Sequence, residues 1–212
     1  MQIEIREKNG GLIYKGKHRN LEDAIKKCRK EKINLRGASL EEADLVGVDF
    51  RSEYLMSANL KGADLKGAFL YNADLERASL ECADFRGASL QNVNFKCANL
   101  EWADFKGANC FEANLKDASL KGADLRASNL VGANLEGADL SGARLEGADL
   151  RGANFIYTNL AGADLRGANL KYAELRSAKL EGANLAGADL EGAKLPASLK
   201  GAIFGKTEKT NK

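Results

Sequence analysis

Large apolar side chains recur at every fifth residue from Leu35 to Leu195, without an insertion. Of these 33 central positions, 27 are Leu, five are Phe and one is Cys110. We number the central position 0 and its neighbours from −2 to +2. Position −2 is almost always Ala, as in Ala63-Asp64-Leu65. This single pattern occupies most of the chain and determines the predicted fold.

A period of five residues fits neither regular secondary structure alone. In an α-helix, steps of five would rotate by about 500° and spread the apolar residues around the axis. In a straight strand, an odd step would send alternate residues to opposite faces. A short extended segment that turns a corner every five residues resolves this conflict, with positions −2 and 0 pointing inward and −1 and +1 pointing outward. Such segments must stack to bury their apolar side, so the pattern predicts an all-β solenoid.

A second correlation, at a spacing of twenty residues, predicts how many segments close one coil. In steps of twenty, position −1 contains Asp44, Asp64, Asp84, Asp104, Asp124, Arg144 and Asp164. Asp occupies only 11 of the 33 such positions overall, so four segments per coil is the best-supported closure. Where Arg144 replaces Asp, Glu146 replaces the usual Lys or Arg at position +1. With stacked strands about 4.8 Å apart, the repeat predicts roughly eight to nine coils.

The signature A-[DN]-L-x-x resembles that of the pentapeptide-repeat family. It runs without a gap from Ile33 to Leu195, slips by one residue at Pro196, and continues to Phe204. The resemblance implies a right-handed, quadrilateral parallel β-helix. It also implies, as one function, binding of DNA gyrase and related type II topoisomerases by mimicry of duplex DNA, with protection from quinolones. Most members of the family have no assigned role.

The first 32 residues differ from the repeat. Alternation around Ile3 and Ile5, followed by the turn signal of residues 8–11, predicts a β-hairpin. Asn20 is expected to cap a helix that runs to about Lys32 and is basic on its outer side. We therefore predict a hairpin-helix cap at residues 1–32, the β-helix at residues 33–204 and a disordered tail at residues 205–212. The basic side of the helix is interpreted as a solvated surface, with a contact to nucleic acid or an acidic partner as the minor alternative.

Composition supports a single domain without a membrane segment. The 212 residues carry a formal net charge of +2 and include one Pro. Because the first residues alternate charged and apolar side chains, no signal peptide is expected, and we predict a cytoplasmic location. The four cysteines, at positions 28, 82, 97 and 110, show no metal or disulfide spacing and are expected to be free thiols.

No constellation of catalytic residues is evident. His18 is the only histidine, so a nucleophilic triad would depend on it alone. We predict no enzyme, no cofactor and no metal site. Gly occupies 17 of the 33 positions at +2, where the chain turns. Because Arg77, Trp102 and Glu112 occupy the same position, we expect that a positive φ is not required there.

Outward apolar residues mark the candidate binding surface, since contiguous exposed aromatic residues often mark protein contacts. The candidates are Phe69, Tyr71, Phe111 and Val131 on the face centred on Leu70, Leu90, Cys110 and Leu130, Tyr54 and Met56 on the adjoining face, and Trp102 at a corner. The alternative is that these side chains only stack along the rod and shield its backbone. We predict a scaffold or binding module for an unidentified protein, with no direct nucleic-acid or membrane contact.

A second predicted contact is the final coil, where two chains would dimerise through Leu195, Leu199, Ile203 and Phe204.

Mimicry of DNA for a topoisomerase is the alternative function. A mimic must present a marked acidic excess, because the groove that it enters is built to meet phosphates. Residues 33–204 contain 24 Asp and Glu against 19 Lys and Arg, and the two signs are interleaved. The repeat also has no interrupting loops between residues 33 and 195, unlike many gyrase-binding members. The sequence therefore favours the scaffold over the mimic.

Overall fold

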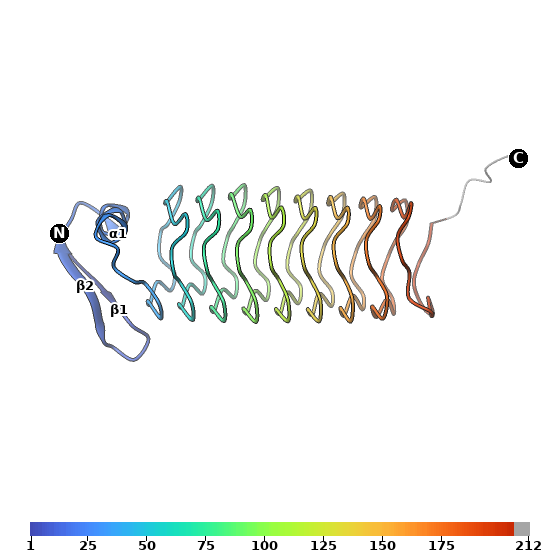
Figure 1. Cartoon of the computed structure of the whole chain (residues 1–212), viewed down its shortest axis with the longest axis horizontal. Coiled ribbons are helices and arrows are strands. Elements are labelled where there is room, and N and C mark those ends of the chain that lie inside the picture. The colour runs from blue at the N-terminus through green and yellow to red at the C-terminus, as the bar shows by residue number, and fades with distance from the viewer. Residues whose placement is uncertain (206–212) are drawn as a thin grey trace, which may run out of the picture.

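The computed structural model describes residues 1–205, which form a straight solenoid with a hairpin and a helix at its N-terminal end (Figure 1). Of the tail predicted for residues 205–212, all but Gly205 lies outside the described residues.

Parallel backbone bridges join residues twenty apart along the solenoid, as in Asp64 to Asp84 and Asp84 to Asp104. Each coil therefore contains four pentapeptides, as the spacing of the Asp column predicts. Near the C-terminal end the spacing falls to nineteen, because Asn184 bridges to Ile203. This change confirms the one-residue slip at Pro196. We number the four faces 1 to 4 by their first central residues, Leu35, Leu40, Leu45 and Phe50.

The hydrogen bonds explain why Asp and Asn dominate position −1. In most repeats, the N–H groups at −1, 0 and +2 donate to adjacent coils, and the N–H at −2 closes the turn. The N–H at +1 has no backbone acceptor in this scheme. At all 23 Asp and Asn residues at position −1, the side-chain Oδ1 accepts from this N–H, as Asp64 does from Lys66 at 3.2 Å. This Asx turn supplies a hydrogen-bond acceptor for the N–H at +1, the one backbone donor of the repeat that has no backbone acceptor. In residues 63–67 the five bonds run from Ala63 to Leu60, Asp64 to Ala43, Leu65 to Asp84, Lys66 to the Asp64 side chain, and Gly67 to Arg86.

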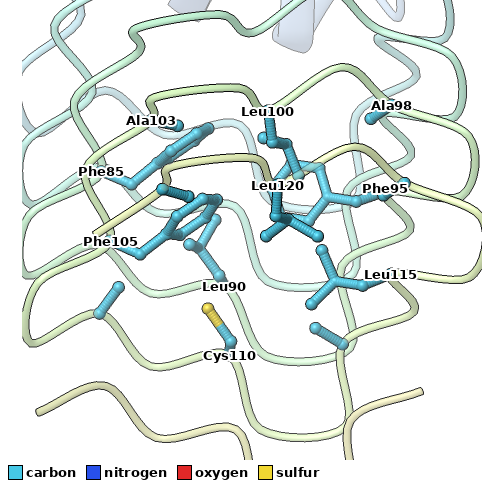
Figure 2. Packing of buried hydrophobic residues seen from close by; sticks show 14 of the residues in the cluster. Phe85, Leu90, Phe95, Ala98, Leu100, Ala103, Phe105, Cys110, Leu115 and Leu120 are labelled. Atoms are coloured by element: carbon cyan, nitrogen blue, oxygen red, sulfur yellow. The ribbon is translucent and has the colours of Figure 1, made fainter. Parts of the chain in front are cut away.

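The core is a continuous column of the side chains at −2 and 0. Every central side chain from Leu35 to Leu185 is buried. Phe85 and Phe105 stack with ring centroids 4.8 Å apart, and Phe95 meets both rings edge-on from face 1 (Figure 2). Cys110 lies beneath this cluster and substitutes for a Leu without leaving the core. Ala at −2 keeps the coil narrow enough for opposite central residues to touch.

The expectation that position +2 needs no positive φ is wrong. Every residue at +2 from Gly37 to Gly192 has φ between 52° and 74°, including Arg77, Trp102 and Glu112. The N–H at −2 of the next repeat closes each turn by donating to the carbonyl of position 0, as Ala63 does to Leu60 at 3.0 Å. A turn with this bond and a positive φ at its third residue resembles type II, which favours Gly there. The glycines therefore meet a backbone requirement that the other residues meet under strain.

The N-terminal segment contains two antiparallel strands, β1 (Gln2–Arg6) and β2 (Leu12–Lys17), followed by helix α1 (Leu21–Lys30). Asn20 caps the helix by accepting a hydrogen bond from the Asp23 N–H at 2.9 Å. The helix ends about two residues earlier than expected from the sequence.

The hairpin and helix pack directly on the first coil. Ile5, Ile25 and Cys28 join the core of the solenoid. The chain just after β1 pairs with the first coil, where the Lys8 N–H donates to the Gly37 carbonyl at 3.1 Å. Arg29 of α1 forms ion pairs with Asp49 and Glu53 of the solenoid. These contacts fix the helix across the N-terminal end of the core (Figure 1).

Candidate interaction surface

Most of the predicted surface residues lie together on face 4. We call the outward residues of this face between Phe69 and Val131 the aromatic patch: Phe69, Tyr71, Ser89, Gln91, Asn109, Phe111, Asn129 and Val131. Phe69, Tyr71 and Phe111 expose 48%, 45% and 37% of their surface, whereas Val131 is half-buried. None of these eight side chains is charged. The patch is therefore a flat surface of four successive coils with aromatic and amide side chains.

The remaining predicted residues are separated from this patch. Tyr54 and Met56 lie on face 1, where Tyr54 is exposed and Met56 is half-buried. Trp102 occupies the corner after face 2 and is exposed. Its indole ring lies over Gly122 of the next coil, where an added Cβ would approach the ring to 2.3 Å. The structure thus gathers four of the seven predicted residues on one face and does not bring Trp102 to them.

Ion pairs border the aromatic patch at both ends. In the coil before it, Arg51 donates two hydrogen bonds to Asp49, at 3.0 and 2.8 Å. In the coil after it, Arg151 donates to Asp149 in the same way, at 2.8 and 2.7 Å. Hydrogen bonds from Arg51 hold the pKa of Asp49 down at about 2, with additional attraction from Arg29. Hydrogen bonds from Arg151 likewise lower the pKa of Asp149. These carboxylates stay ionised and paired at neutral pH.

Face 3 carries the Asp column and its alternating cations. Arg86 pairs with Asp84 at 2.7 Å and reaches Asp104 of the next coil at 3.6 Å. At the position where the charges are exchanged, Arg144 lies 3.5 Å from Asp124 and 3.9 Å from Glu146. The reversed pair of Arg144 at −1 and Glu146 at +1 therefore preserves opposite-charge contacts along face 3, as the sequence predicts. The adjacent cations compete with any bound metal for these carboxylates.

Sequence reasoning missed one site residue, Glu53. It is the only charged residue at the inward position −2 in the repeat. Burial raises its pKa, while Arg29 opposes this shift. The Arg29 Nε atom lies 3.6 Å from a carboxylate oxygen of Glu53. The missing Ala at position −2 is the signal in the sequence that could have identified this contact between α1 and the solenoid.

The predicted dimer end lies on the last described coil. Leu195, Ile203 and Phe204 are exposed, and Leu199 is half-buried. Leu190, at a central position, is also half-buried, in contrast to its equivalents in earlier coils. The end of the core therefore presents apolar side chains within residues 1–205.

The histidine and two of the cysteines have defined surroundings in the structure. His18 contacts the Tyr14 hydroxyl at 2.6 Å, at the end of the hairpin and far from the aromatic patch in the sequence. Cys28 and Cys110 are buried, and burial raises the pKa of their thiols to about 11 and about 12. Within residues 1–205, no group of three or more His, Cys, Asp or Glu side chains is placed to hold a metal ion. The same residues include no helix with the length and apolarity needed to span a bilayer.

Comparison with known families identifies the repeat. The model of pentapeptide repeats matches eight copies in segments that together extend from residue 33 to residue 196. The chain belongs to the pentapeptide-repeat family. Membership supports the right-handed β-helix that the resemblance implies. A search of curated proteins found no significant match.

Several solved structures are similar to this pentapeptide-repeat protein. HetL, a pentapeptide-repeat protein involved in regulating heterocyst differentiation in the cyanobacterium Nostoc sp., is 37% identical, with a TM-score of 0.45; the match covers 89% of this chain and 98% of HetL. Full-length QnrB1, a plasmid-mediated fluoroquinolone resistance protein, is 21% identical over 79% of this chain and 91% of its own, with a TM-score of 0.41. A thylakoid-lumen member from Arabidopsis thaliana is 36% identical over 52% of this chain and 70% of its own, with a TM-score of 0.30.

Proposed function

We propose that this protein is a non-enzymatic, rigid scaffold that binds another protein through the aromatic patch. The observation that carries the proposal is the exposure of Phe69, Tyr71 and Phe111 on one flat face whose outward positions carry no charge over four successive coils. Burial of exposed aromatic side chains is a common source of binding energy in protein interfaces. The rigid backbone adds to affinity because little conformational entropy is lost on binding.

Partner capture tests this proposal. The wild-type protein and the Phe69→Ser, Tyr71→Ser, Phe111→Ser variant would be immobilised and exposed to extract from the source cells. We expect the variant to keep its fold and to lose the captured partner. A variant with Tyr157→Ser and Tyr172→Ser is the matched control, because it removes exposed aromatic residues elsewhere on the rod. Equal capture by the patch variant and wild type would refute a role for the patch.

The proposed scaffold comprises about eight to nine coils with residues 1–32 as its N-terminal cap. Contacts of Ile5, Ile25 and Cys28 with the core support the capping role. A solenoid needs such a cover because its terminal coil would otherwise expose apolar side chains and unpaired backbone groups. We place this scaffold in the cytoplasm, and that location remains a prediction.

Topoisomerase binding by DNA mimicry is the alternative proposal. Its weakness is the distribution of charge, because the Asp column of face 3 is paired with Lys and Arg, as in Asp84 with Arg86. A gyrase supercoiling assay, with and without a quinolone, tests it directly. Inhibition or drug protection at low micromolar protein would establish the mimic, and absence of both with folded protein would exclude it.

We also propose dimerisation through the C-terminal coil. The exposed side chains of Leu195, Ile203 and Phe204 support this contact. The Ile203→Glu, Phe204→Glu variant should convert such a dimer to a monomer, because it places charges in the apolar contact. Sedimentation at micromolar concentration measures the change. A monomeric mass for the wild-type protein would refute the end-to-end dimer.

A further inference from the structure

We propose that the partner of the aromatic patch is a second copy of this chain, bound face to face with the two rods parallel. The inference deepens the proposed function and rests on its assignment of the patch as a binding surface. It follows from the order of charged and uncharged side chains in the two outward columns of face 4.

The first column contains position −1 and the second contains position +1. From the N-terminal end, the first column contains Asp49, Phe69, Ser89, Asn109, Asn129 and Asp149. The second column contains Arg51, Tyr71, Gln91, Phe111, Val131 and Arg151. Both columns are thus uncharged for four coils. Every acidic residue at the borders lies in the first column, and every basic residue lies in the second.

A twofold axis parallel to the rods brings opposite columns together. In such a pair, each residue of the first column lies over the second column of the other copy at the same level. Arg51 then lies over Asp49 of the second copy, and Arg151 lies over Asp149. Tyr71 lies over Phe69, so that aromatic side chains meet beside one ionic border. The arrangement is isologous, since each contact occurs twice, as a closed dimer requires.

The antiparallel arrangement is unfavourable by the same reasoning. Each column would then lie over itself in reverse order. With the patches centred, Arg51 would lie over Arg151 and Asp49 over Asp149. Like charges facing each other across an interface oppose association and select against that orientation. The parallel pair is therefore the arrangement that the charges of face 4 favour.

Other faces fit a second copy less well. Face 3 has the same order of signs, with Asp64 before Lys66 and Asp84 before Arg86, but it lacks an uncharged centre. The charged side chains of face 3 would have to lose their hydration along the whole contact. The free-energy cost of this desolvation offsets the attraction between opposite charges of the two copies. On face 1, Asp74 would lie over Glu76 of the second copy, which repels. Of these three faces, face 4 alone combines an uncharged centre with complementary borders.

The size of the contact predicts its strength. Six coil levels span roughly 29 Å, and one side of a coil is roughly 10 Å wide. The projected area is thus roughly 300 Å² per copy, below the about 800 Å² per partner of a standard interface. We therefore expect a weak dimer that forms reversibly as protein concentration rises. The guanidinium groups of Arg51 and Arg151 are exposed enough to reach a second carboxylate without breaking their own pairs.

Sedimentation velocity of the purified protein, from low micromolar to near-millimolar concentration, is the first test. We expect the Ile203→Glu, Phe204→Glu variant, which lacks the end-to-end contact, to be monomeric at low micromolar concentration and to form the face-to-face dimer toward the upper end of this range. In that same background, the added Phe69→Ser, Tyr71→Ser and Phe111→Ser changes should weaken dimerisation at least about tenfold. A monomer throughout this range would overturn the inference, whereas the patch would still stand as a surface for a different protein if partner capture remains patch-dependent.

Disulfide trapping tests the orientation. In a Cys82→Ser, Cys97→Ser background, Ser89→Cys and Gln91→Cys would be introduced into separate chains. Residue 89 lies over residue 91 of the second copy only in the parallel pair. We expect cross-linked dimers in the mixture of the two variants and few in either variant alone. Efficient cross-linking of Ser89→Cys to itself would overturn the parallel arrangement.

A charge exchange gives an independent test of register. The Asp149→Arg, Arg151→Glu variant reverses one border, as Arg144 and Glu146 already do on face 3. We expect the variant to pair with itself as well as wild type does, and to pair poorly with wild type. Native mass spectrometry of the mixture measures the mixed dimers. Mixed dimers at the statistical proportion would overturn the proposed register.

Discussion

At the scale of single residues, two requirements of the backbone explain the repeat signature. The Asx turn explains Asp or Asn at position −1, and the positive φ explains the frequency of Gly at +2. A non-Gly residue in this conformation costs about 1–2 kcal/mol. Fifteen such residues occur between Glu42 and Ser177, so the protein tolerates considerable local strain. Close packing and the hydrogen-bonded ladder hold these corners in place.

The Asx turn predicts a specific cost for Asn114→Ala. The change removes the acceptor of the Lys116 N–H, at 3.3 Å, and the donor to Asn94, at 3.0 Å. We expect a loss of about 1 kcal/mol in the free energy of unfolding, measured by chemical denaturation. Ser89→Ala is the control, because among residues 1–205 its side chain makes no such bond, and it should be nearly neutral. Equal effects of the two changes would contradict this role of the Asx turn.

The corner conformation predicts different costs for two glycines. Gly107→Ala meets no atom within 4 Å, so only its φ of 68° opposes it and about 1 kcal/mol should be lost. Gly122→Ala must in addition displace the Trp102 ring and should be more destabilising. In a Trp102→Ser background the two glycine changes should cost the same. A persistent difference in thermal unfolding there would show that the ring is not its cause.

At the scale of elements, an ionic cluster joins helix α1 to the solenoid. Arg29 of the helix contacts Asp49 and Glu53, and Arg51 also binds Asp49. Glu53 lies where the repeat otherwise places a small or apolar residue, so its charge is partly desolvated. Arg29 provides the compensating charge. The carboxylate at position 53 therefore serves as a contact for helix α1.

This cluster predicts a dependence of stability on pH. The folded-state pKa of Asp49 is about 2, below its ordinary value of 3.8. The stabilisation it provides is therefore complete above the ordinary value and is lost as pH falls toward 2. Asp49→Asn should be less stable than wild type at neutral pH, and the difference should shrink as the pH approaches 2. Thermal unfolding of wild type and Asp49→Asn, followed by circular dichroism at several pH values, measures this difference in stability. A difference that does not change with pH would contradict the stabilising role of ionised Asp49.

At the scale of the whole molecule, stability is distributed along a one-dimensional stack. Each coil contacts only its neighbours, so a defect acts according to its position. Leu115, in the middle of the rod, is 1% exposed, whereas Leu195, near its end, is 37% exposed. The same substitution should therefore have unequal consequences at the two positions.

Leu115→Ala should cost about 2–5 kcal/mol, because it opens a cavity in the close-packed core. Leu195→Ala should cost less than about 1 kcal/mol, because its side chain is already exposed to water. Replacement by Asp should divide the rod at position 115 but only loosen its end at position 195. Limited proteolysis distinguishes these outcomes. Cleavage confined to the C-terminal coil in both Asp variants would contradict the expected dependence of stability on position along the rod.

The sequence by itself determined the solenoid, the four pentapeptides per coil and the slip at Pro196. These features are legible because every repeat meets the same steric and hydrogen-bonding demands, which leaves a strict period of five and a correlation at twenty. The hairpin signal and the Asn20 cap are local and were equally readable. The sequence also identified the outward aromatic residues, and its spacing of twenty placed Phe69, Tyr71 and Phe111 on one face and Trp102 at a corner.

Only the tertiary structure decided the corner conformation, the exposed fractions of the patch residues and the contact of Glu53 with Arg29. Corner φ could not be inferred from composition, because non-Gly residues at nearly half of the corners concealed a requirement that the stacked backbone enforces. The exposure of Phe69, Tyr71 and Phe111 depends on how side chains of neighbouring coils pack against them, which the period of twenty does not specify. The contact of Glu53 joins a helix to a distant repeat. Such long-range placement follows from packing. The charged residue at position −2 marks Glu53 as unusual in the sequence but does not identify Arg29 as its partner.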